Sequence, residues 1–309
     1  MNLPAGYSAR PAELGDLDAV VELVKAADLA DAGVQDPVRE HLQYTWERAS
    51  VSLERDTRVV LAPDGRLAAY ANVEGNHPEL SLELWVRVHP AHRGGGLGSA
   101  LLDWGEALSL ERSPTVPVLR NSVSHEDAVA HDLLEANGYA QVRVFWHMLC
   151  DLDGAVEPVP SLEGIEIRRY EHPGDVRTFY DVLEESFLGH WGMEPYPYED
   201  HEREMATWNP DLAWLAVGAE GRVVGGTLGT LVEGTGWVDI LGVLEPFRRR
   251  GVGRALLLAQ FASFAAKGAP IAALNVDSGN DTGAPSLYAA AGMRVHRAWD
   301  VFEKREPGR

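Results

Sequence analysis

In two stretches of the chain, residues of one face recur at every second position, which is the period of a β-strand. Each stretch is followed by a glycine-rich turn. The first strand pattern places four apolar side chains on one face: Leu82, Leu84, Val86 and Val88. The second places four residues on one face: Trp237, Asp239, Leu241 and Val243. Helical spacing follows each turn, from Leu97 and from Val252, and another strand pattern comes next. We therefore predict an α/β fold with a mixed sheet in each half.

The two turns are copies within an internal repeat. Arg93, Gly96 and Gly98 align with Arg248, Gly251 and Gly253 at an offset of 155 (248 minus 93). Further on, "LRNSV" aligns with "ALNVD" and "ANGY" with "AAGM", both at an offset of 154. Self-similarity over this length is typical of a duplicated domain.

The stretch "DLDGAVEPVPSLEG" separates the two copies. Its prolines, glycines and acidic residues indicate an exposed connection. We expect domains at residues 1–152 and 164–309, joined by a linker at 153–163.

Composition narrows the possible classes of protein. The net charge of -20 argues against a nucleic-acid groove and favours a cationic or amine-bearing small molecule as partner. The N-terminus shows no secretory pattern, no apolar run reaches the ~18 residues of a membrane span, and Cys150 is the single cysteine. We expect a cytoplasmic protein with no membrane partner and no metal site; the choice between monomer and homodimer stays open.

A glycine turn before a helix indicates an anion site, because the first backbone N–H groups of the helix have no partner within it. Both turns lack the lysine and hydroxyl pair of a P-loop and the third glycine or alanine of a dinucleotide fingerprint. Taken singly, either turn is also compatible with a plain strand-to-helix connection. Two copies in equivalent places favour binding.

The motif Arg-x-x-Gly-x-Gly after a strand ending in Val-x-Pro or Val-x-x-Pro resembles motif A of the GNAT superfamily of acyl-coenzyme A dependent N-acetyltransferases. Residues 275–293 resemble the motif B that follows it in that superfamily. The resemblance covers most of each half, so it implies two tandem GNAT domains, an organisation similar to that of the mycothiol synthases.

The resemblance implies acetyl-coenzyme A as the acyl donor. The second half would bind it through Leu241, Val243, Arg248, Arg249, Arg250, Gly251, Val252, Gly253, Arg254, Ala255 and Asn280. The matching residues of the first half are Val88, Arg93, Gly94, Gly95, Gly96, Leu97, Gly98 and Ser99.

Acyl transfer from a thioester to an amine needs a base for the amine and an acid for the leaving thiolate. Tyr288 lies where motif B carries its tyrosine acid, and Asp239 is a candidate base. Glu233, His190 or water remain alternatives to Asp239. The offsets place Leu84 and Leu134 at the equivalent positions of the first half. We predict that the C-terminal domain catalyses and the N-terminal one does not; the alternative is a non-catalytic acyl-coenzyme A binding or sensing protein.

The segment 187–202 is rich in aromatic and acidic residues and falls where GNAT domains form a wall of the acceptor site. Trp191, Tyr196 and Tyr198 are the candidates for contact with the acceptor amine. Alternatively, these aromatics pack the two domains together. A mycothiol-related amine and an aminoglycoside-like antibiotic are both compatible with the sequence.

Overall fold

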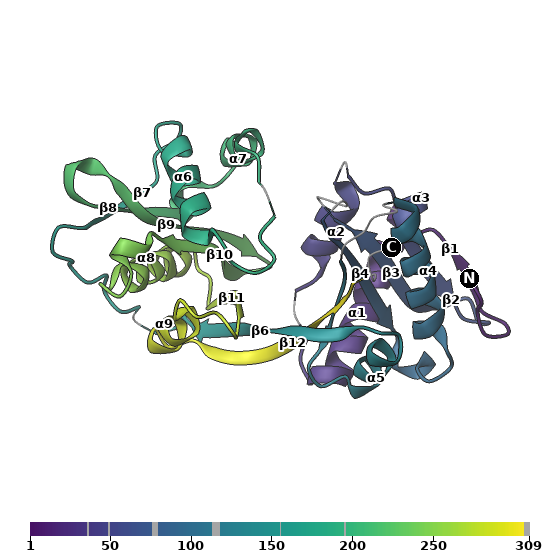
Figure 1. Ribbon diagram of the computed structural model, residues 1–309. Coiled ribbons are helices and arrows are strands. Elements are labelled where there is room, and N and C mark those ends of the chain that lie inside the picture. Colours follow the sequence, from purple (N-terminus) through teal and green to yellow (C-terminus); the bar gives the residue numbers. More distant parts are fainter. Residues whose placement is uncertain are drawn as a thin grey trace. The chain divides into compact units, whose positions relative to one another are not determined.

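The computed structural model describes the chain except Asp36, Ala49, residues 76–79 and 113–117, Ala155, Pro195 and residues 306–309. It divides into two compact units (Figure 1). Unit 1 comprises Met1–Phe145 and Arg297–Arg309, and unit 2 comprises Trp146–His296. Each unit is an α/β sandwich of the predicted kind.

Unit 1 is built on a mixed sheet with the strand order β1-β2-β3-β4-β5-β12. Its strands are β1 (Ser8–Arg10), β2 (Thr57–Leu61), β3 (Leu67–Glu74), β4 (Leu82–Val88), β5 (Leu119–Ser124) and most of β12 (Arg294–Lys304). Its helices are α1 (Leu17–Ala32), α2 (Arg39–Glu47), α3 (Leu53–Asp56), α4 (Leu97–Arg112) and α5 (Ala128–Ala136). The pair β4–β5 is parallel, whereas β1–β2, β2–β3, β3–β4 and β5–β12 are antiparallel.

Helices cover both faces of the unit 1 sheet. α1 and α2 pack on one face, around the buried Tyr70. α4 and α5 pack on the other face, where Leu82 and Leu84 are fully buried as their alternation predicts. Val86 and Val88 continue that face beside the first turns of α4.

Unit 2 repeats this plan with the strand order β6-β11-β10-β9-β8-β7. Its strands are the second half of β6 (Ala140–Asp151), then β7 (Glu166–Arg169), β8 (Ala213–Val217), β9 (Val223–Val232), β10 (Thr235–Val243) and β11 (Ile271–Asp277). Its helices are α6 (Val176–Phe187), α7 (Tyr198–Met205), α8 (Val252–Ala266) and α9 (Ala284–Ala290). α6 and α8 lie on opposite faces of β9 and β10 (Figure 1). No helix in the described part of the chain is both long and apolar enough to cross a membrane.

The last strand does not stay with its own half of the sequence. Trp299–Lys304 of β12 pair with β5, so the C-terminal residues complete the sheet of unit 1. The compact units therefore end at other residues than the expected domains 1–152 and 164–309. The boundary between the units depends on the pairing of β12 with β5. These strands are far apart in the sequence, so no local pattern indicates that they pair.

The expected linker lies along helix α8 for part of its length. Val156 and Leu162 pack against apolar clusters that contain α8 residues, and Glu157 forms an ion pair with Arg254. The connection is therefore attached to unit 2, although many of its residues are exposed.

The shared strand face predicted for β10 is wrong. A β-bulge at Asp239, between Val238 and Ile240, shifts the pairing of β10 with β9 by one residue. As a result Val238 packs in the same cluster as Leu241, on the α8 side, while Trp237 is not part of that cluster. A bulge inserts an extra residue, and this reverses the alternation on one side of it.

Candidate active site

Each unit contains a pair of parallel strands that separate. Among the described residues, β4 pairs with β5 at Leu82–Glu83, and β10 pairs with β11 at Thr235–Trp237. Beyond these pairs the facing backbone N–H and C=O groups of β4 and β10 have no strand beside them. An extended ligand with amide groups, such as a pantetheine arm, fits a gap of this kind.

The glycine turns adopt the same backbone conformation at the end of each gap. In unit 1, Gly94 and Gly96 have φ of 75° and 89°; in unit 2, Arg249 and Gly251 have φ of 58° and 83°. Each pair precedes a helix, α4 or α8. Left-handed residues in such a turn direct successive N–H groups inward and form an anion site. The residues present therefore fit the pyrophosphate of coenzyme A in both units.

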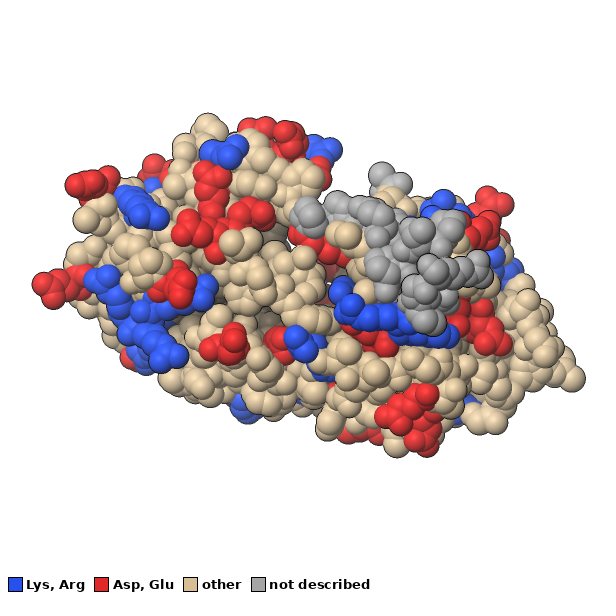
Figure 2. Space-filling view, in the orientation of Figure 1, with Lys and Arg blue, Asp and Glu red and all other residues tan. Residues whose placement is uncertain are grey.

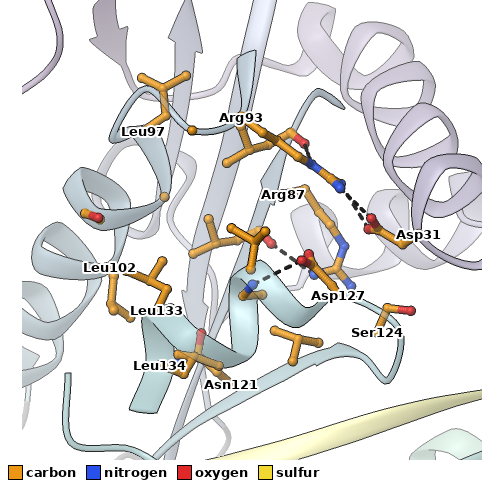
Figure 3. Close-up of a pocket in the computed structure, with 18 of the residues that line it drawn as sticks. Asp31, Arg87, Arg93, Leu97, Leu102, Asn121, Ser124, Asp127, Leu133 and Leu134 are labelled. Atoms are coloured by element: carbon orange, nitrogen blue, oxygen red, sulfur yellow. Dashed lines mark hydrogen bonds and ion pairs between the residues drawn. The ribbon is translucent and has the colours of Figure 1, made fainter. Parts of the chain in front are cut away.

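In unit 1 the gap and the turn open into one cavity of about 340 Å³ (Figure 3). Its lining includes the predicted residues Val88, Arg93, Gly94, Gly96, Leu97, Gly98 and Ser99. Gly95 is exposed beside this lining. Leu134, the counterpart of Tyr288, also lines the cavity.

Sequence reasoning missed the polar residues that face this cavity. They are Asp28, Asp31, Arg87, Asn121, Ser124, Asp127 and Arg297. Asp31 forms an ion pair with Arg93, and Arg297 from β12 donates to Asp28 at 3.1 Å. The repeat carries no signal for Asp31, because the residue 155 positions later is Ser186, which contacts Arg248 through its backbone carbonyl. It carries none for Arg297 either, because this residue reaches unit 1 through the pairing of β12.

In unit 2, Asp239 lies at the β10 bulge. Its Oδ1 accepts a hydrogen bond from Thr230 Oγ1 at 3.2 Å. The side chain reaches solvent, but the protein around it removes much of its hydration, and this raises the pKa of Asp239 to about 6. A carboxyl with this pKa can exchange a proton near neutral pH.

Tyr288 is buried on α9, in the cluster that contains Leu257 and Met293. Burial raises the pKa of its hydroxyl to about 12, so the group stays protonated at neutral pH. Asn280 precedes this helix, and its Oδ1 accepts from the Thr282 backbone N–H at 2.9 Å. The roles of Tyr288 and Asn280 stay predictions.

Side chains of the predicted unit 2 turn are engaged within the protein. The Arg248 guanidinium donates to the carbonyls of Val243 and Ser186, both at 2.9 Å. Arg254 is paired with Glu157. Leu241 and Val243 pair with β9 and pack under α8, beside Gly253.

The aromatic residues expected at the acceptor wall have contacts inside unit 2. Tyr196 accepts a hydrogen bond from the Tyr180 hydroxyl through its carbonyl at 2.8 Å. The Tyr198 ring lies edge-on to Tyr180 and under Arg177. Trp191 is partly exposed, in the turn after α6. Tyr196 and Tyr198 thus pack α6 against α7, and their contact with an acceptor stays a prediction.

The charge that favours a cationic acceptor is the net charge of -20 of the whole chain. Figure 2 shows acidic and basic side chains in separate patches on one face, with other residues over most of it. No group of His, Cys, Asp and Glu in the described ranges has the arrangement of a metal site.

In each unit two parallel strands separate, and the first of them leads into a glycine turn and a helix. This arrangement defines the class of acyl-coenzyme A dependent acyltransferases. The family model "Acetyltransferase (GNAT) family" matches residues 21–139 and 176–293. The chain belongs to this family, in its tandem form, and is an N-acetyltransferase. The predicted fold class and family are confirmed.

Relatives extend over nearly the whole chain. A mycothiol acetyltransferase of Thermobispora bispora is 32% identical over 290 residues, covering 90% of this chain and 92% of its own. One from Geodermatophilus obscurus is 30% identical, with 93% of each chain covered. A GCN5-related N-acetyltransferase from Sphaerobacter thermophilus has a TM-score of 0.90 at 33% identity and covers 100% of this chain and 98% of its own. A tandem GNAT protein of clavulanic acid biosynthesis shares the fold, with a TM-score of 0.73 at 17% identity, 98% of this chain and 100% of its own.

Proposed function

We propose that unit 2 transfers an acetyl group from acetyl-coenzyme A to the primary amine of a small molecule related to mycothiol. The observation that carries the assignment to unit 2 is a contrast between the two units. Unit 2 has Asp239 as the extra residue of the β10 bulge, and β4 of unit 1 has no such bulge. Unit 2 also has Tyr288 where unit 1 has Leu134. The names of the relatives support the class of acceptor.

In the proposed mechanism Asp239 accepts a proton from the incoming ammonium group. With a pKa of about 6, the carboxyl is ionised at neutral pH. This pKa is also near enough to neutral pH for the carboxylate to take up and release a proton. A free main-chain N–H of β10 near Val243 polarises the thioester carbonyl. The amine nitrogen bonds to the carbonyl carbon, the carbon–sulfur bond breaks, and the Tyr288 hydroxyl protonates the leaving sulfur. The nitrogen then loses its excess proton to give the neutral amide, and this proton restores the Tyr288 hydroxyl.

Unit 1 binds acyl-coenzyme A in this proposal without turning it over. It has the same turn conformation and an open cavity, which support binding. Unit 1 has no bulge residue in the place of Asp239, and Leu134 has no proton to give. Unit 1 is therefore a second binding site rather than a second catalytic centre.

Release of free thiol across a panel of primary amines tests the activity. We expect Tyr288→Phe to lower kcat by about 10²–10⁴-fold and to leave the Kd for acetyl-coenzyme A unchanged. Leu134→Val is the matched control in unit 1, with turnover retained. Loss of turnover in Leu134→Val but not in Tyr288→Phe would overturn the assignment. Tight acetyl-coenzyme A binding with no thiol release across the panel would favour a sensing protein.

Trp191 offers a separate test of the acceptor wall. Trp191→Ala should raise the KM for the amine and leave the Kd for acetyl-coenzyme A unchanged. The reverse pattern would reject this residue as part of the wall.

A further inference from the structure

Of the three guanidiniums that line the unit 1 cavity, two form ion pairs with lining carboxylates and one is an exception among the described residues. Asp31 pairs with Arg93, and Asp28 pairs with Arg297. Asp127 accepts the backbone N–H of Ala130 at 3.0 Å and so caps α5. All three carboxylates of the lining thus have a partner inside the protein.

The exception is Arg87. One of its N–H groups donates to the carbonyl of Val86 at 3.0 Å, and its guanidinium lies 4.4 Å from the centre of the Trp85 ring. Among the described residues it makes no ion pair. Figure 3 shows its guanidinium extending between Asp31 and Asp127. Burial lowers its pKa to about 10. The charges of Asp28, Asp31 and Asp127 act on this guanidinium without a direct contact. Apart from the bond to Val86, its N–H groups donate to no acceptor among the described residues, so a bound carboxylate could accept hydrogen bonds from them.

The position of Arg87 on β4 suggests which part of a ligand it meets. It lies between Val86 and Val88, both of which line the cavity on the separating stretch of the strand. The glycine turn further along would hold the pyrophosphate, so the neighbourhood of Val86 and Val88 is left for the thioester end. The equivalent residue of unit 2, at 87 plus 155, is Gly242. The arginine is therefore particular to unit 1.

We propose that the unit 1 cavity selects an acyl-coenzyme A whose acyl group ends in a carboxylate, with Arg87 as the partner of that carboxylate. The planar guanidinium can donate two parallel hydrogen bonds to a carboxylate. The inference rests on the proposed binding of acyl-coenzyme A by unit 1.

Calorimetric titration of the full chain with coenzyme A, acetyl-coenzyme A and succinyl-coenzyme A tests this. We expect two sites per chain, one of which binds succinyl-coenzyme A roughly tenfold or more tightly than acetyl-coenzyme A. Arg87→Met should abolish that preference, and Arg87→Lys should retain part of it. Arg58→Met is the matched control: Arg58 also donates to main-chain carbonyls and stacks on a tryptophan of unit 1, but it lies outside the cavity lining.

The outcomes separate the two proposals. One site per chain for every ligand, with Leu134→Trp without effect, would reject acyl-coenzyme A binding by unit 1. Two sites with no preference for the succinyl ligand would reject the role of Arg87 but not acyl-coenzyme A binding by unit 1. A preference that survives in Arg87→Met would have the same meaning. Equal melting temperatures of wild type and Arg87→Lys would show that the variant is folded.

Discussion

Arg93 and Arg248 make the same main-chain contact in the two units. The Nε of each donates to the carbonyl five positions earlier, that of Val88 at 3.2 Å and that of Val243 at 2.9 Å. Each guanidinium also reaches the end of a helix, at Asp31 or at Ser186, which are again 155 positions apart (186 minus 31). Each arginine thus connects the end of a strand, the glycine turn and the end of a helix. These contacts hold the turn in one conformation.

The raised pKa of Asp239 predicts how activity depends on pH. The ionised carboxylate is the active base, so kcat/KM should rise as pH increases through about 6 and then level off. Asp239→Asn should remove this rise and lower kcat by about 10²–10⁴-fold. A pH–rate profile of both proteins checks this. A rise near pH 6 that persists in Asp239→Asn would transfer the role to another group.

The raised pKa of Asp239 also predicts how stability depends on pH: stability should fall as pH rises, whereas activity should increase. Its folded pKa lies above the unfolded value of about 3.9, so stability falls as pH rises from about 4 to 6. Asp239→Asn should therefore melt at a higher temperature than the wild type at pH 8, and at the same temperature at pH 4. A lower melting temperature at pH 8 would contradict the burial argument.

Local patterns explain why so much of the fold could be predicted. The alternation that ends at Val88 and the helix that starts at Leu97 depend on neighbouring residues alone. The strand face predicted for Asp239 is wrong because a bulge leaves no mark in the spacing of apolar residues. The sequence does not indicate Arg297, because its contact with Asp28 spans 269 positions and depends on which sheet the last strand joins.

The ion pair between Glu157 and Arg254 places a linker carboxylate beside the unit 2 glycine turn. Glu157→Gln should remove a negative charge near the pyrophosphate site and lower the Kd for acetyl-coenzyme A by roughly two- to fivefold at low salt. The effect should fade in high salt. Titrations at two salt concentrations check it, with the exposed Glu220→Gln as control. An equal effect of both variants would indicate only the change in net charge.

Gly226 shows why β9 needs glycine at its centre. A Cβ at this position would lie 2.4 Å from the Phe179 ring and 3.0 Å from Leu215. Phe179 is fully buried and cannot move aside, so Gly226→Ala should lower the free energy of unfolding by about 1–3 kcal/mol. Gly154→Ala, where a Cβ would meet open space, should leave it unchanged. Denaturant titration measures both, and Phe179→Leu should restore part of the loss.

Asp300 connects the last strand to two histidines of unit 1. It is buried, with His125 Nδ1 at 2.9 Å and His131 Nε2 at 3.2 Å. The hydrogen bond to Asp300 raises the pKa of His125. A raised histidine pKa stabilises the fold fully below the unfolded value of about 6.5, and this contribution is lost as pH rises through the folded pKa.

His125→Gln should therefore lower the melting temperature at pH 5.5 and have no effect at pH 8.5. The His125 side chain is 56% exposed, so solvent screens the pair and the shift at pH 5.5 should be small, about 1–2 °C. The exposed His41→Gln is the control and should change neither value. Because Asp300 lies on β12, a shift confined to acidic pH would show that protonation of His125 stabilises the attachment of this strand to unit 1. An equal shift at both pH values would show that the imidazole acts through packing instead.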